Sequence, residues 1–86
     1  MFKESVEKIH YSNGSIEAEF HYKNTELCHT LCKAWYENGQ LKCILKRKEG
    51  MLHGLCKWWY PDGKIKYKIN YLNGIRHGLQ ISYIYE

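Results

Sequence analysis

The 86-residue sequence has no long apolar run, a single proline and no low-complexity segment. A membrane-spanning helix needs roughly 18 or more apolar residues in succession, and no window approaches that. The first residues, MFKESVEKIHYSNG, also lack the apolar core of a secretion signal. We therefore expect one ordered, soluble domain that resides in the cytoplasm.

Arginine is scarce. Eleven of the thirteen basic residues are lysine, and the formal net charge is a modest +4. Sequence-specific recognition of nucleic acids relies on the forked guanidinium group of arginine, which lysine does not replace. This composition disfavours a nucleic-acid-binding function without excluding a lysine-rich surface that contacts other anions.

The sequence is built from a repeat. Asn-Gly or Asp-Gly pairs recur at 13–14, 38–39 and 62–63, and His29, His53 and His77 recur every 24 residues. The first copy carries one extra residue, which we assign to 24–28. A fixed period of this length predicts units that bury apolar surface by stacking on their neighbours. We divide the chain into a half repeat at 1–10 and repeats at 11–35, 36–59 and 60–83.

Apolar and polar residues alternate between these turns, and such alternation predicts half-buried β-strands. Asn-Gly and Asp-Gly pairs supply the positive φ angles of tight hairpins. The predicted fold is all-β: a single twisted antiparallel meander sheet of about seven strands, from 6–11 to a last strand at 79–85. The sheet consists of three to four hairpin repeats, and we expect no long helix.

Strict alternation assigns the side chains to two faces of this sheet. One face is expected to be apolar and to collect Ile16, Phe20, Leu41, Leu45, Ile65, Tyr67, Ile69 and Tyr71. The opposite face is expected to collect charge, from Glu17 and Glu19 to Lys42, Lys46, Lys64, Lys66 and Lys68. A row of lysines is more often a solvated surface than a binding site for an acidic partner.

The four cysteines are expected to be reduced thiols. Cys32 and Cys56 occupy equivalent positions in successive repeats, so their backbones should lie two strands, or roughly 10 Å, apart. A disulfide needs Cα atoms within about 7 Å. Free thiols also agree with a reducing compartment.

Histidine and cysteine show no catalytic or metal-binding pattern. Cys28, His29 and Cys32 come nearest to half of a zinc site, but no second ligand pair accompanies them, and the repeat alone accounts for His53 and His77. No nucleophile, base and orienting group occur at a fixed spacing, and no glycine-rich phosphate loop is present. We expect no enzymatic activity, no metal and no cofactor.

Three segments resemble a known repeat family. YENGQLK at 36–42, YPDGKIK at 60–66 and YLNGIRHGL at 71–79 look like MORN repeats, in particular the variant found in bacterial antitoxin-like and large-DNA-virus proteins. Copy one departs most, with Thr25 and Thr30 where glycine is expected. The resemblance implies a twisted sheet of hairpins without enzymatic activity, used for protein contacts or, in some members, proposed lipid contacts.

A contact surface is predicted in the third copy, because it holds more aromatic and basic residues than the repeat requires. Trp58 stands where the equivalent strands have Ala34 and Ser82, and tryptophan and tyrosine are favoured anchors at interfaces. The predicted partner-binding residues are Trp58, Tyr60, Lys66, Lys68 and Tyr83.

The sequence thus predicts a non-enzymatic protein-binding module. Antitoxin, immunity or anti-defence inhibition is the expected role, in the host cytoplasm if the chain is viral. A homo-oligomer or hetero-complex is expected to form through a sheet edge, such as that of the last strand, or through the aromatic face. The alternative is a binder of acidic lipid or nucleic acid that uses the lysine-rich face, with nucleic acid the less favoured.

Overall fold

The computed structural model describes residues 4–23, 30–78 and 81–82, and within them every regular element is a β-strand. In chain order these are β1 (Glu4–His10), β2 (Ile16–Lys23), β3 (Leu31–Trp35), β4 (Leu41–Lys48), β5 (Met51–Leu52), β6 (Gly54–Trp59), β7 (Ile65–Leu72), β8 (Ile75–Arg76) and β9 (Ile81–Ser82). The described chain contains no helix with the length and hydropathy to span a membrane.

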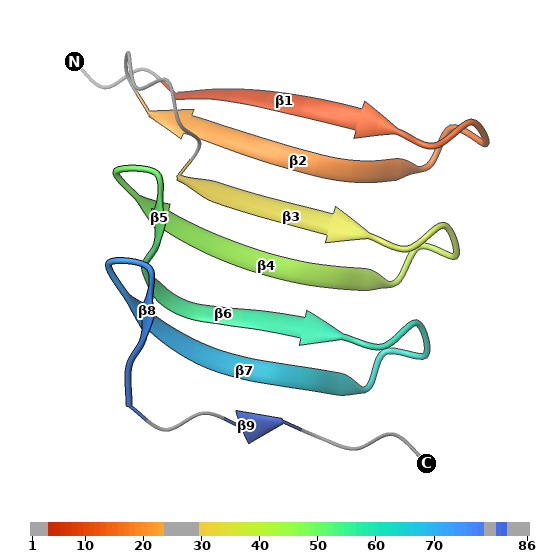
Figure 1. Cartoon of the computed structure of the whole chain (residues 1–86). Helices are drawn as coiled ribbons and strands as arrows, with labels where there is room; N and C mark the ends of the chain where they lie inside the picture. The colour runs from red at the N-terminus through yellow and green to blue at the C-terminus, as the bar shows by residue number, and fades with distance from the viewer. Residues whose placement is uncertain (1–3, 24–29, 79–80, 83–86) are drawn as a thin grey trace.

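The strands form one antiparallel meander sheet, as predicted (Figure 1). Its order is β1-β2-β3-β4-β6-β7-β8, with β5 paired to β4 and β9 paired to β7. The two-residue strands β5 and β8 were not expected; each lies beside the end of the longer strand that precedes it. The predicted insertion at 24–28 and most of the predicted last strand lie outside the described residues.

Three similar turns close the long hairpins at one end of the strands. In each turn the amide of a tyrosine donates to the carbonyl four residues later, and a glycine amide donates back to that tyrosine, as in Tyr11 to Ser15 at 2.8 Å and Gly14 to Tyr11 at 3.0 Å. Gly14, Gly39 and Gly63 have φ near +91°, a conformation that only glycine adopts readily. The Asn-Gly and Asp-Gly pairs therefore act as the sequence predicts.

Each long hairpin contains a β-bulge next to its turn, which corrects the predicted assignment of faces. In each hairpin the register shifts by one residue on the side of the turn. The last pairs before the shift are Ile9 with Ala18, Ala34 with Cys43 and Trp58 with Tyr67. The shifts pair Ile16 with His10, Leu41 with Trp35 and Ile65 with Trp59. Because paired residues share a face, the three aliphatic residues lie on the opposite face from the one predicted.

Successive hairpins are joined at both ends of the strands. Near the turns, the Tyr11 hydroxyl donates to the Trp35 carbonyl at 2.6 Å and the Tyr36 hydroxyl donates to the Trp59 carbonyl at 2.7 Å. At the other end, the Gly74 amide donates to the Leu52 carbonyl at 2.8 Å. The two tyrosine bonds repeat with the sequence period, and all three bonds hold neighbouring units in register.

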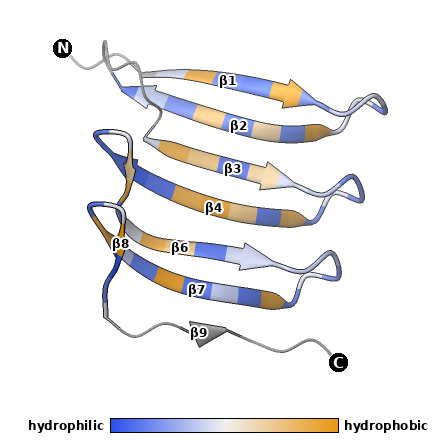
Figure 2. Cartoon of the chain, viewed as in Figure 1, coloured by the Kyte–Doolittle hydropathy of each residue, from blue (hydrophilic) through white to orange (hydrophobic). Residues whose placement is uncertain are grey.

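The molecule is one layer thick. Its principal extents are 47 × 39 × 15 Å, and its radius of gyration of 14.2 Å exceeds the roughly 12 Å typical of a compact domain of this length. Hydropathy alternates most clearly along β2 and β7 (Figure 2). The only buried hydrophobic residues in the described chain are Ala18, Cys32, Cys43, Cys56 and Ile69. The core is therefore a thin band, mostly of small side chains, along one face of the sheet.

Candidate protein-contact surface

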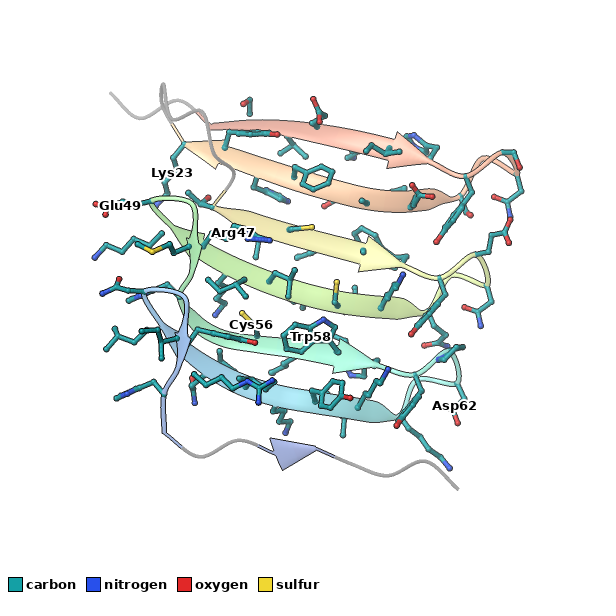
Figure 3. All side chains as sticks on the ribbon, viewed as in Figure 1. Lys23, Arg47, Glu49, Cys56, Trp58 and Asp62 are labelled. Carbon is teal, nitrogen blue, oxygen red and sulfur yellow. The ribbon has the colours of Figure 1, made fainter. Side chains whose placement is uncertain are left out.

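The face that carries this band is here called the cysteine face. One row of cross-strand partners crosses it through six strands in the order Ile9, Ala18, Ala34, Cys43, Trp58 and Tyr67. The residues of the row change in size along the sheet: small side chains occupy β2, β3 and β4, and large aromatic ones occupy β6 and β7. Cys56 and Trp58 project from the same strand, two residues apart (Figure 3).

An aromatic cluster occupies the third-copy end of the cysteine face. The rings of Trp58 and Tyr67 meet edge to face, with centroids 6.1 Å apart and planes at 85°. The Lys66 ammonium lies 5.4 Å from the ring centroids of both Tyr67 and Tyr60. Cation–π contacts of this kind hold the lysine stem against the rings. The result is a continuous aromatic surface with a positive charge, and Tyr67 remains 38% exposed.

The predicted site residues fall into three groups. Trp58, Tyr60 and Lys66 are brought together, and Tyr67 joins them. Lys68 is the direct partner of Lys57, one residue away from the Trp58–Tyr67 pair, and so lies on the opposite face. Tyr83 lies outside the described residues.

Tyr67 is the residue that sequence reasoning left out of the site. The alternating pattern assigns it to the apolar face as one member of a strand, whereas in the structure it connects Trp58 to Lys66. The available signal was its place beside Trp58: in the second copy the equivalent pair is Ala34 and Cys43, both small. Two large aromatics replace two small residues at the same point of the repeat.

The opposite face is here called the lysine face, and its central row runs through Lys33, Ile44, Lys57 and Lys68. Lys57 and Lys68 are directly opposed on adjacent strands. Like charges at this spacing repel each other and destabilise a sheet. All three lysines are half-buried, so their stems pack along the sheet while their ammonium groups reach solvent. Trp35 and Trp59 flank this row on the same face.

The cysteine side chains support packing rather than chemistry. Cys32, Cys43 and Cys56 are free thiols and buried, Cys56 completely so, and Cys28 lies outside the described residues. Burial raises the pKa of the Cys32 and Cys43 thiols, so both stay protonated at neutral pH. A buried, protonated thiol is a poor nucleophile and a poor metal ligand. Across residues 4–23, 30–78 and 81–82, no cluster of three or more His, Cys, Asp or Glu side chains could hold a metal ion.

The sequence matches a profile of the MORN repeat variant at three segments, 3–24, 29–48 and 52–73, which together cover most of the chain. Each segment contains one long hairpin: β1 with β2, β3 with β4, and β6 with β7. No curated protein and no solved structure matches the chain significantly. The matched segments place the aromatic cluster in the third repeat.

Proposed function

Because this chain belongs to the MORN repeat variant family, whose repeats are non-catalytic binding repeats, we propose that it is a protein-binding module that uses its cysteine face. The aromatic cluster of Trp58, Tyr67, Tyr60 and Lys66 is the proposed centre of the contact. Tryptophan and tyrosine contribute most to binding when a partner encloses them and excludes water.

One observation carries this proposal: all described strands belong to one sheet, so within the described residues no second layer covers the cysteine face. The accessible surface is 6261 Å², whereas a compact monomer of 10.3 kDa exposes about 5,400 Å². The excess belongs to a sheet whose apolar side has only its own small residues for a core. An exposed aromatic patch on a single layer is typical of a surface that a partner covers.

The proposed role is the masking of a partner protein in the cytoplasm, as an antitoxin, immunity protein or anti-defence inhibitor would do. A broad, thin sheet of binding repeats would act by occupying another protein's surface. The resemblance of the repeats to antitoxin-like and viral MORN variants supports this role, and if the chain is viral the site of action is the host cytoplasm.

The lysine face favours a second candidate function, the binding of acidic lipid headgroups or, with less support, nucleic acid. The opposed Lys57 and Lys68 repel each other, and an anion placed between them would remove that cost. Binding through the lysine face should weaken as salt rises, because salt screens contacts to lysine. Binding through the cysteine face should change little, because apolar contacts are not screened.

A salt titration separates the two candidates. The protein is used as bait in the cell that expresses it, the captured protein is purified, and its affinity is measured at rising salt. In parallel, the protein is mixed with phosphatidylserine and phosphatidylcholine vesicles and with single-stranded DNA. The proposal expects an affinity for the captured protein that changes little with salt. Salt-sensitive binding to phosphatidylserine vesicles or DNA, with no captured protein, would contradict it.

A further inference from the structure

We propose that a second copy of this chain covers the cysteine face, so that two sheets form a sandwich with two-fold symmetry. This inference rests on the proposed function, because it concerns the same surface: the second copy covers the cysteine face until the partner protein displaces it. It comes from the sizes of the residues along one row of the sheet and from the charges beside that row. Neither observation depends on the identity of any other partner.

The row contains both a projection and a depression. Ala18, Ala34 and Cys43 are small and adjacent, on three neighbouring strands. The next two strands carry Trp58 and Tyr67. At about 4.8 Å between strands, the small residues leave a depression roughly 10 Å wide next to a projecting tryptophan. A surface with both features on one face can complement itself.

A two-fold axis parallel to the strands, between β3 and β4, brings the two features together. This axis places β6 over β2 of the second copy, and β4 over β3 of the second copy. Trp58 then lies over Ala18 of the second copy, and Cys43 lies over its Ala34. Large side chains opposite small ones allow facing sheets to pack about 10 Å apart without voids or collisions.

The charges agree with the same axis. Glu17, Lys42 and Lys66 are the extra residues of the three bulges, and they directly precede Ala18, Cys43 and Tyr67 of the row, on the side of the turns. The axis places Glu17 on β2 opposite β6 of the second copy, whose neighbours β4 and β7 carry Lys42 and Lys66. Each acidic bulge therefore lies opposite the strand that separates the two basic bulges of the other copy. The two-fold axis makes this arrangement occur twice in the dimer. Complementary charges of this kind fix the register of an interface.

The available area is sufficient for a specific dimer. Six strands about 4.8 Å apart, each contributing about 20 Å of length, give a contact on the order of 600 Å² per copy. The total of about 1,200 Å² lies at the lower end of stable interfaces. The row lies away from β5 and β8, which pair with the last residues of β4 and β7. The short hairpins therefore do not cross the proposed centre of the contact.

Light scattering on the full chain and three variants tests the inference. The wild type is expected to have the mass of a dimer. Ala18→Trp should be monomeric, because two tryptophans would collide at each Ala18 position. Trp58→Ala should dissociate about 30-fold more readily, as expected for loss of an interface anchor. An equimolar mixture of Ala18→Trp and Trp58→Ala should form mixed dimers, because each tryptophan then faces an alanine. Ile44→Trp, on the lysine face, is the control and should stay dimeric.

Circular dichroism confirms that each variant is folded, and Ala34→Lys replaces Ala18→Trp if that variant does not fold. The inference is wrong if the wild type is monomeric at high concentration, if Ala18→Trp dimerises like the wild type, or if the mixture stays monomeric. A monomeric wild type that loses its captured protein on Trp58→Ala would refute the second copy and leave the proposed function standing. A wild-type dimer that binds its captured protein equally well with and without Trp58→Ala would support the second copy and refute the proposed function.

Discussion

A tyrosine hydroxyl connects each of the first two hairpins to the tryptophan carbonyl of the next. Tyr11 and Tyr36 occupy equivalent positions, and their bonds are 2.6 and 2.7 Å long. Their surroundings differ: partial burial raises the pKa of Tyr11, and the negative charges of Glu17 and Glu37 raise it further. In the second hairpin the bulge residue is Lys42, whose ammonium lies 5.6 Å from the Tyr36 ring centroid. The tyrosine-to-carbonyl bond is thus surrounded by carboxylates at Tyr11 and lies beside a lysine ammonium at Tyr36.

The raised pKa of Tyr11 predicts a pH dependence of stability. The group stabilises the fold fully below its ordinary pKa of 10.0, and this contribution is lost as pH rises through the higher folded-state pKa, because the phenolate no longer donates to Trp35. We expect Tyr11→Phe to be less stable than the wild type at about pH 8 and to approach it at about pH 11, measured by urea unfolding. An equal difference at both pH values would contradict the assignment.

At the scale of the strand, the alternating pattern predicted the elements well and their faces in part. The long hairpins, their turns and their antiparallel order follow from apolar periodicity and from the Asn-Gly and Asp-Gly pairs. The bulges do not, because a bulge adds one residue without changing the residue types around it. Each bulge reverses the face of every residue between it and the turn, which moved Ile16, Leu41 and Ile65 to the lysine face.

The candidate site, too, is predicted by the sequence in part and depends in part on the bulges and on side-chain geometry. The sequence identifies Trp58 because it exceeds what the repeat requires at its position, and Lys66 because the third copy as a whole holds more aromatic and basic residues than the repeat requires. Strict alternation places Lys68 on the same side as Lys66, whereas in the structure the bulge at Lys66 separates the two. The role of Tyr67 as the link depends on ring geometry, which no sequence pattern specifies.

The short hairpin turns predict a stabilising substitution. Glu49 and Asn73 precede Gly50 and Gly74 in equivalent turns, and both have positive φ, at 52° and 50°. Asparagine tolerates this conformation better than glutamate. We expect Glu49→Asn to raise the free energy of unfolding by about 0.5 kcal/mol or more, and the reverse change Asn73→Glu to lower it by a similar amount. Thermal unfolding checks both, and a loss of stability in Glu49→Asn would count against this turn geometry.

At the scale of the whole molecule, the fold separates two surfaces of different chemistry on a single layer. The cysteine face carries the aromatic cluster and the thin core, and the lysine face carries the opposed lysines. Tyr67 of the cluster is exposed, and because the described strands all belong to one sheet, no second layer in this part of the chain covers the cluster. The central claim is that binding occurs through the cysteine face.

The most direct test compares one substitution on each face. Trp58→Ala removes the anchor of the aromatic cluster, and Lys57→Ala, its neighbour on the same strand, removes a charge from the lysine face. Binding of both variants to the protein captured by the wild type is measured by calorimetry, with folding checked by circular dichroism. The account predicts that Trp58→Ala weakens binding by 2 kcal/mol or more, about 30-fold, and that Lys57→Ala changes it by less than about threefold. The opposite ranking, in two folded variants, would place the binding surface on the lysine face.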